Sequence, residues 1–220
     1  MLEKMDLFFE NRLEGYEEHM LSEIEGAREF YPFTAGRLPA GEGCEILDLG
    51  CGTGLELDAY FSRCPKGRVT GIDLSAAMLG ALADKFSEKC QDGSLRLIHG
   101  SYFDVPLGEE AFDAAVSVES LHHFTKKQKL LLYRKLWQAL KENGIFILTD
   151  YFAESEELEK EYFRIYERMK KEQGITDGGF YHYDTPLTAE HETEVLKEAG
   201  FSRVRILKSW GATYTLEAER

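Results

Sequence analysis

The sequence predicts an α/β protein with a mostly parallel sheet, helices on both faces and an antiparallel last strand. Short apolar runs alternate with helical patterns between residues 44 and 151, as is typical of parallel strands joined by right-handed crossovers. The run AFDAAVSVES is rich in Val and Ala, as expected for a strand covered on both faces. The last run, RVRILKSWGATYTLEAE, has a turn signal at Trp210–Gly211 and predicts an antiparallel pair at one side of the sheet.

The chain ahead of the sheet is predicted to be helical. Apolar residues recur at helical spacing within residues 1–40, which favours an amphipathic helix. The stretch YPFTAGRLPAGEG (31–43) contains two prolines and three glycines and is predicted to be a loop.

Strands and helices then follow in order. Ser75 is placed to cap one helix, Thr125 and Gln128 have capping-box spacing at the start of another, and Gly200 is placed to end a third. The strands are expected at 46–49, 69–72, 94–100, 111–120 and 143–152, and the helices at 55–61, 75–89, 125–141, 154–172 and 188–199.

Charge and composition disfavour several kinds of partner, site and location. The 220 residues carry a net charge of -14, so a nucleic-acid partner would require a local basic patch and is not expected. Cysteines 44, 51, 64 and 90 form no C-x-x-C pair, so we expect neither a disulfide framework nor a metal site. The N-terminus lacks a signal-like apolar core and no run is long enough for a membrane span, so a cytoplasmic protein is expected. The basic residues nearest to a patch are expected to form a solvated helix face: Lys126, Lys127, Lys129, Arg134 and Lys135.

The segment DLGCGTG (48–54) follows the first strand of the sheet, where ligands of open α/β sheets bind. Its glycines do not fit G-x-G-x-x-G in either register, and the chain contains neither a P-loop nor a G-x-S-x-G elbow. Asp73 ends the next strand, 19 residues beyond Gly54, where a carboxylate can accept hydrogen bonds from both ribose hydroxyls. With Asp48 beneath the loop, these residues suit a ligand that has a ribose and a cationic group but no phosphates.

Four segments, in this order, resemble the class I S-adenosylmethionine-dependent methyltransferases: EILDLGCGTG, VTGIDLSAAML, LIHGSYFDVPLGEEAFDAAVSVESLHHF and LKENGIFILTDYF. The resemblance implies a Rossmann-like, seven-stranded sheet with its last strand antiparallel. It also implies a helical cap over residues 1–40 and a methyltransferase domain over 41–220, with a helical or lid insertion at about 154–187, together one structural domain. The implied cofactor is S-adenosyl-L-methionine, with S-adenosyl-L-homocysteine as product.

The same resemblance implies the cofactor site. The glycine loop would line the methionyl part, Asp48 would lie near its ammonium, Asp73 would hold the ribose and Leu74 would pack on the adenine. Ser101 stands where the family often has Asp, so a hydroxyl or a backbone amide would replace the usual carboxylate contact. The full set of implied cofactor residues is Tyr16, Asp48, Gly50, Cys51, Gly52, Gly54, Asp73, Leu74, Ser101, Tyr102 and Glu119.

Candidate catalytic residues follow the fourth strand. Glu119 is expected where the transferred methyl emerges, and His122 has the chemistry of a general base, with packing as the alternative for both His122 and His123. Tyr16 is expected to close over the cofactor or simply to pack, and Arg12 to pair with the cofactor carboxylate. The aromatic segment at 173–187 is either a lid or a packed loop.

The predicted function is methyl transfer by in-line displacement to a small-molecule acceptor, in a monomer or homodimer that has no membrane partner. The leaving thioether is neutral, so proximity and orientation can supply most of the catalysis and neither a metal nor a triad is required. Three alternatives stay open: an enzyme that makes a carboxymethyl form of the cofactor, a non-catalytic protein that binds the cofactor, and, disfavoured by its glycine pattern, a nicotinamide dehydrogenase.

Overall fold

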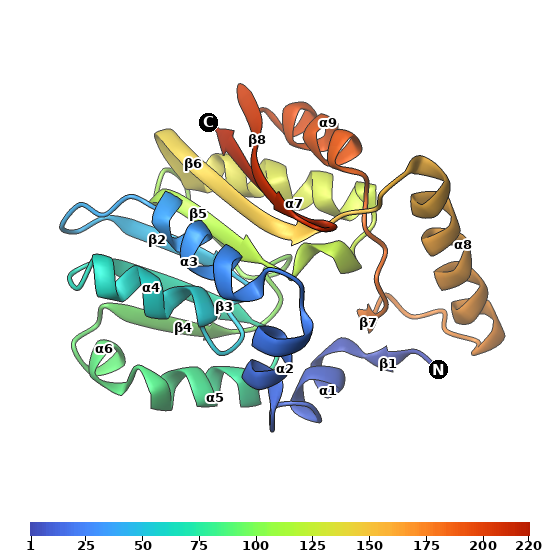
Figure 1. Ribbon diagram of the computed structural model, residues 1–220, viewed down its shortest axis with the longest axis horizontal. Helices are drawn as coiled ribbons and strands as arrows, with labels where there is room; N and C mark the ends of the chain where they lie inside the picture. Colours follow the sequence, from blue (N-terminus) through green and yellow to red (C-terminus); the bar gives the residue numbers. More distant parts are fainter.

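Seven strands form one sheet at the centre of the computed structural model, which describes all residues 1–220 (Figure 1). The order across the sheet is β4-β3-β2-β5-β6-β9-β8, so the strand order reverses between β2 and β5. The strands are β2 (Glu45–Leu49), β3 (Arg68–Asp73), β4 (Leu95–His99), β5 (Phe112–Val118), β6 (Leu140–Tyr151), β8 (Arg203–Trp210) and β9 (Thr213–Glu219).

The predicted fold class is confirmed. The strand pairs from β4 to β6 are parallel, whereas β9 is antiparallel to both β6 and β8. The last turn lies at Gly211 and Ala212, one residue later than predicted, because Trp210 still pairs with Thr213. β6 also begins earlier than predicted, with Leu140 opposite Phe112 ahead of an irregularity in the register.

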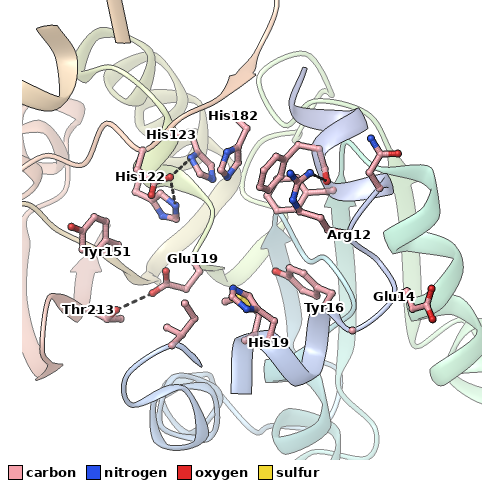
Figure 2. A pocket seen from close by; sticks show the side chains of 17 residues that line it. Arg12, Glu14, Tyr16, His19, Glu119, His122, His123, Tyr151, His182 and Thr213 are labelled. Carbon is pink, nitrogen blue, oxygen red and sulfur yellow. Dashed lines mark hydrogen bonds and ion pairs between the residues drawn. The ribbon is translucent and has the colours of Figure 1, made fainter. Parts of the chain in front are cut away.

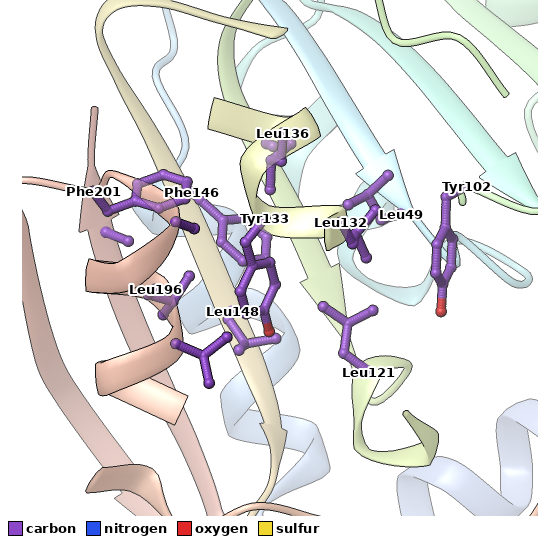
Figure 3. Close-up of a cluster of buried hydrophobic side chains, with 14 of the residues drawn as sticks. Leu49, Tyr102, Leu121, Leu132, Tyr133, Leu136, Phe146, Leu148, Leu196 and Phe201 are labelled. Atoms are coloured by element: carbon purple, nitrogen blue, oxygen red, sulfur yellow. The ribbon is translucent and has the colours of Figure 1, made fainter. Parts of the chain in front are cut away.

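Helices cover both faces of the sheet, and alternate residues of each strand face opposite layers (Figure 1). On β5, Ala115 packs in the layer that contains α7 (Lys126–Ala139) and α9 (Ala189–Ala199). Ala114 and Val116 pack in the opposite layer, which contains α3 (Ala27–Arg37) and α4 (Leu55–Arg63). Figure 3 shows Tyr133 of α7 and Leu196 of α9 beside Phe146 and Leu148 of β6, and Leu132 of α7 beside Leu49 of β2. This double coverage accounts for the run rich in Val and Ala that identified β5.

Most helix boundaries agree with the prediction. Ser75 accepts a hydrogen bond from the Met78 amide, and Thr125 and Gln128 make the predicted capping box. The helix expected at 75–89 divides at Phe86, whose backbone leaves the helical region. The helices after the first strand of the sheet are α4 (Leu55–Arg63), α5 (Ala76–Lys85), α6 (Ser87–Gln91), α7 (Lys126–Ala139), α8 (Glu156–Glu172) and α9 (Ala189–Ala199), and a 3-10 turn, η1, covers Leu121–His123.

The N-terminal segment corrects two predictions. Residues 1–40 form a short strand, β1 (Glu3–Lys4), and three helices, α1 (Met5–Glu10), α2 (Tyr16–Glu23) and α3 (Ala27–Arg37), rather than one amphipathic helix. Left-handed backbone at Gly15 and Gly26 separates the helices. The loop predicted from residue 31 begins only after Arg37, because α3 continues through Pro32. The buried Phe30, Tyr31, Thr34 and Ala35 hold this helix against the sheet.

The solvated basic face predicted on α7 is present in part. Lys129 is buried against α9, where its Nζ lies 2.5 Å from Glu192 Oε2. Lys126 and Arg134 pair with Glu194 and Glu198 of α9. Lys126, Lys127 and Arg134 are nevertheless exposed as predicted, whereas Lys129 is buried and Lys135 is half-buried.

The N-terminus and the segment after β6 meet at the carboxyl end of the sheet (Figure 1). A two-residue strand, β7 (Tyr181–His182), pairs antiparallel with β1 inside the segment predicted to be irregular. The Met5 amide donates to the Phe180 carbonyl. No helix in the chain combines the length and apolar composition that a bilayer span requires.

Candidate active site

A narrow cavity of about 60 Å³ lies at the carboxyl ends of β2, β3 and β5. Gly50, Gly52 and Asp73 form part of its floor, and Phe9, Tyr16 and Phe180 cover it from the N-terminal helices and the β7 segment. Eight residues of the predicted cofactor set line this cavity: Tyr16, Gly50, Gly52, Asp73, Leu74, Ser101, Tyr102 and Glu119. The structure therefore brings most of that set together at the point where the strand order reverses.

Two positions in the glycine loop favour glycine over any other residue. Gly50 has φ 76°, and an added Cβ would lie 2.1 Å from Ser120 Oγ. Gly52 has φ 48° with nothing within 4 Å of an added Cβ, so its backbone faces open space in the cavity. The Gly50 amide donates to the Ile72 carbonyl at 2.8 Å and so ties the loop to β3. The loop thus exposes backbone to a ligand at little steric cost.

Asp73 is held in place by two backbone donors. Its Oδ2 accepts from the Gly52 amide at 2.9 Å, and its Oδ1 accepts from the Ser75 amide at 2.8 Å. Burial raises the pKa of Asp73, while these hydrogen bonds oppose the rise. Each oxygen of a carboxylate has a second lone pair, so the side chain can still accept from a pair of ribose hydroxyls.

Two buried carboxyl groups beneath the loop lack donors. Asp48 Oδ2 and Glu56 Oε1 have no hydrogen-bond partner, and neither has the neighbouring Thr53 hydroxyl. Burial, together with the nearby Glu56, raises the pKa of Asp48 well above its usual range, and burial also raises that of Glu56. A shared proton or a bound cation would satisfy these oxygens. The ammonium group of S-adenosylmethionine is such a cation, so the residues present fit the cofactor that the sequence implied.

The remaining predicted cofactor residues lie outside the cavity wall. Asp48 is below the loop, and Cys51 is buried with its Sγ directed at Gly71 of β3. Gly54 precedes the first residue of α4 and packs against the Leu82 side chain. Arg12 pairs with Glu3 at 3.2 Å and lies over the Phe8 ring. It lines the second cavity, which is described next.

A second cavity of about 700 Å³ adjoins the first. Phe9, Tyr16 and Glu119 line both cavities. Figure 2 shows His122, His123 and His182 on one side of the larger cavity, with Tyr16 and His19 of α2 across from them. The wall also includes Tyr151 at the end of β6 and Thr213 at the start of β9.

Glu119 stands where the two cavities join. Its backbone is left-handed, with φ 49°, and its amide donates to the Thr149 carbonyl at 2.8 Å. Thr213 donates a hydrogen bond of 3.1 Å to Oε1 of Glu119. Burial, reinforced by Asp150 and opposed by His122, raises the pKa of Glu119 to about 8.

His122 belongs to a buried ion pair. Its Nδ1 lies 2.5 Å from Asp150 Oδ1, and the Leu121 amide donates to Asp150 Oδ2. Burial alone would lower the pKa of His122, but Asp150, Asp184 and Glu119 raise it to about 9. Burial alone would raise the pKa of Asp150, but His122 keeps it below its usual range.

Asp184, which follows β7, lies close to the His122–Asp150 pair. Its Oδ1 is 3.2 Å from His123 Nδ1 and 3.6 Å from His122 Nε2. His182 stacks on Phe8 with its ring centroid 3.4 Å away and lies 4.7 Å from the His123 ring. Burial lowers the pKa of His182 to about 4, and the neighbouring His123 adds to the effect.

Several residues of these sites were not anticipated from the sequence, among them Glu56, Ser120, Asp150 and Asp184. Asp150 is an acid within the apolar run ILTDYF, a position that signals a paired, buried charge. Asp184 carries no such signal, because its neighbours are Tyr183 and Thr185 in a segment without periodicity.

Comparison with known proteins agrees with this geometry. A family model described as a methyltransferase domain matches residues 46–144. The carboxy-S-adenosyl-L-methionine synthase of Wolinella succinogenes is 30% identical over 195 residues, which cover 81% of this chain and 76% of that protein. The O-methyltransferase cnsE of Penicillium expansum is 30% identical over 114 residues, but these span only 52% of this chain and 40% of the fungal protein.

A solved structure with a similar fold is human N-acetylserotonin methyltransferase in complex with S-adenosylmethionine. The two align with a TM-score of 0.61 at 17% identity, over 89% of this chain and 52% of the human chain. The sheet order, the cavity beneath the glycine loop and the relatives agree on one assignment: this chain belongs to the class I S-adenosylmethionine-dependent methyltransferase family, and its cofactor is S-adenosylmethionine.

Proposed function

We propose that this protein transfers the methyl group of S-adenosylmethionine to a small-molecule acceptor bound in the larger cavity. The observation that carries the proposal is the wall common to both cavities, formed by Phe9, Tyr16 and Glu119. These three residues stand where the two cavities join. A methyl group held in the narrow cavity would face an acceptor in the larger cavity at this junction, as an in-line displacement requires. The structural contribution is mainly proximity and orientation.

The size and lining of the larger cavity support a small acceptor. Its volume of about 700 Å³ lies within the range of about 300–1,000 Å³ that is typical of small-molecule sites. Aromatic rings from α1 and α2 line it together with polar groups from η1 and β9. The net charge of -14 disfavours a polyanionic partner.

Glu119 and His122 are the proposed acceptor-contacting residues. Glu119 is the nearer to the transferred methyl, because it lines both cavities, whereas His122 lines only the larger one. Asp150 fixes the imidazole of His122 through Nδ1, so that the opposite nitrogen is the one available in the cavity.

Carboxymethyl-cofactor synthesis is the second candidate, because the carboxy-S-adenosyl-L-methionine synthase relative aligns over most of both chains. The groups near the junction give it less support. An added carboxylate on the cofactor would lie near Asp150 and Asp184, whose lowered pKa values keep them negatively charged, and the Arg12 guanidinium is already paired with Glu3.

The test is a transfer assay with methyl-labelled S-adenosylmethionine and a panel of phenols, amines and carboxylic acids, followed by a cell metabolite extract. We expect label in an acceptor and S-adenosylhomocysteine as co-product. Asp73→Ala is expected to weaken cofactor binding by about 1 to 3 kcal/mol, the usual range for lost charged hydrogen bonds, and Asp73→Asn by less. Titration calorimetry with S-adenosylhomocysteine measures this loss.

Two results would contradict the proposal. Mass spectrometry that finds a carboxylated cofactor and no methylated acceptor would favour the second candidate. Tight S-adenosylhomocysteine binding with no transfer to any acceptor would indicate a non-catalytic binding protein.

A further inference from the structure

Three side chains from two distant segments converge on one point in the wall of the larger cavity. His122 and His123 lie in the η1 turn after β5, and Asp184 follows β7 some sixty residues later. One potential ligand atom from each lies within 4.8 Å of the others. We propose that His122, His123 and Asp184 bind a divalent first-row transition metal ion, with Zn²⁺ as the representative case.

The spacing of these atoms suits a metal. Asp184 Oδ1 lies 3.2 Å from His123 Nδ1 and 3.6 Å from His122 Nε2. Metal bonds of about 2.0 to 2.1 Å place two ligands of a tetrahedral site about 3.3 to 3.4 Å apart. An ion can therefore be bound with shifts of a few tenths of an ångström along these two edges.

The lone pairs needed for metal binding are available. Asp150 occupies Nδ1 of His122, which leaves Nε2 directed at Asp184. A carboxylate on the far nitrogen is the usual support of a metal-binding imidazole, because it fixes the ring and its tautomer. The other neighbour of His123 Nδ1 is the Tyr183 carbonyl at 3.4 Å, a long contact that leaves this nitrogen free for a closer ligand.

The backbone holds the two segments in register. The Thr185 amide donates to the His122 carbonyl at 2.8 Å, and the Ala153 amide donates to the Leu187 carbonyl at 2.9 Å. Asp184 is thus fixed beside the η1 turn by its own neighbour in the chain. Such preorganisation reduces the entropic cost of assembling a metal site from residues far apart in sequence.

The charge around the cluster also favours a cation. Asp150 is buried beside His122, and Glu119 lies close by at the cavity junction. The nearest guanidinium in the cavity wall, that of Arg12, is already paired with Glu3. Two imidazoles and one carboxylate leave coordination positions open toward the cavity, where water or an acceptor oxygen can bind. This last role rests on the proposed function, whereas the site itself rests only on the geometry.

The test is a titration of the untagged, EDTA-treated full-length protein with Co²⁺, whose visible absorption reports coordination, followed by competition with Zn²⁺. We expect one Co²⁺ per chain, displaced by Zn²⁺. Asp184→Asn and His123→Ala should each weaken Co²⁺ binding by at least about tenfold, the scale seen when groups at a metal site are removed. His191→Ala is the matched control, because His191 pairs with Glu159 and is absent from the cluster.

S-adenosylhomocysteine affinity, measured on the same samples, verifies that the variants are folded. No absorption change in the wild type would overturn the metal site, as would binding unaffected by both Asp184→Asn and His123→Ala. Because neither cofactor nor acceptor is needed, Co²⁺ binding together with an absence of methyl transfer would contradict only the proposed function.

Discussion

The carboxyl groups of Asp48 and Glu56 lie buried under the glycine loop with unpartnered oxygens. Without the cofactor they stabilise nothing, because a buried carboxylate that lacks a donor loses its hydration without compensation. We propose that the ammonium group of the bound cofactor lies near the same oxygens. We therefore expect these two residues to lower the stability of the free protein and to increase its affinity for the cofactor.

Asp48→Asn separates the two effects. Asp48 has a raised pKa in the folded chain, so the folded state binds its proton more tightly than the unfolded state, and the free energy of unfolding falls as pH rises above about 4. The amide carries no charge and offers Glu56 a donor. We expect a variant that melts a few degrees higher at about pH 8, since about 1 kcal/mol moves the melting temperature by about 2 to 4 °C in a chain of this size.

Its advantage should shrink at about pH 5, and S-adenosylhomocysteine binding should weaken at both pH values. Scanning calorimetry with and without S-adenosylhomocysteine makes the comparison. Equal pH slopes for the two proteins would show that Asp48 does not titrate abnormally.

Residues of the cofactor cavity were predictable where the signal is local. Gly50, Gly52 and Asp73 belong to a contiguous strand-loop-helix pattern whose geometry the sequence dictates. Asp150 and Asp184 reach His122 only because β6 lies beside β5 and β7 pairs with β1. Contacts that depend on strand neighbours cannot be inferred from spacing along the chain.

At the scale of elements, α7 and α9 are joined by a buried polar contact. Lys129 and Glu192 are 2% and 0% exposed, and the Tyr133 hydroxyl donates to the second oxygen of Glu192. From the sequence alone, a lysine on a highly charged helix is predicted to be exposed to solvent, because the helix that covers it is not known. Periodicity located α7, but it could not show that α9 covers this face.

Lys129→Met is expected to destabilise the protein by about 3 to 5 kcal/mol, because it leaves Glu192 buried without its counter-ion. The double variant Lys129→Met with Glu192→Gln should recover part of this loss. Lys126→Met is the matched control, since Lys126 and its partner Glu194 are exposed, and it should change stability by less than about 0.5 kcal/mol. Urea unfolding measures all three, and equal effects of the two single variants would contradict the burial argument.

At the scale of the whole molecule, the N-terminal helices and the β7 segment form one cover over the sheet. Met5, Phe9 and Phe180 stand over the cofactor floor, and the β1–β7 pair joins the two segments. The cavity beneath them is about 60 Å³, well below the ~300 Å³ at which small-molecule pockets begin. We therefore predict that this cover moves when the cofactor binds.

Hydrogen exchange can detect that movement. With saturating S-adenosylhomocysteine we expect faster amide exchange in α1, because the ligand displaces Met5 and Phe9 from the cavity. Exchange in the central strands β5 and β6 should not accelerate, which serves as the internal control. Unchanged exchange in α1 on binding would show that the cofactor enters without displacing the cover.

The strand order illustrates what the sequence can specify at this scale. Alternating strands and helices predicted a parallel sheet, and the family resemblance predicted its seven strands and antiparallel end, all of which the structure contains. The cover was predicted only as helix and loop, because two-residue strands such as β1 and β7 have no periodicity to detect.

The wall formed by Phe9, Tyr16 and Glu119 also limits how such an enzyme can diversify. A substitution that enlarges the acceptor space at Phe9 or Tyr16 also removes part of the enclosure around the methyl donor. Under the proposed function, a broader acceptor range is therefore expected to come with weaker donor binding, so the two properties cannot be selected independently at these positions. Variation that changes acceptor preference alone is confined to the far side of the larger cavity, at positions such as His19, Tyr151 and Thr213.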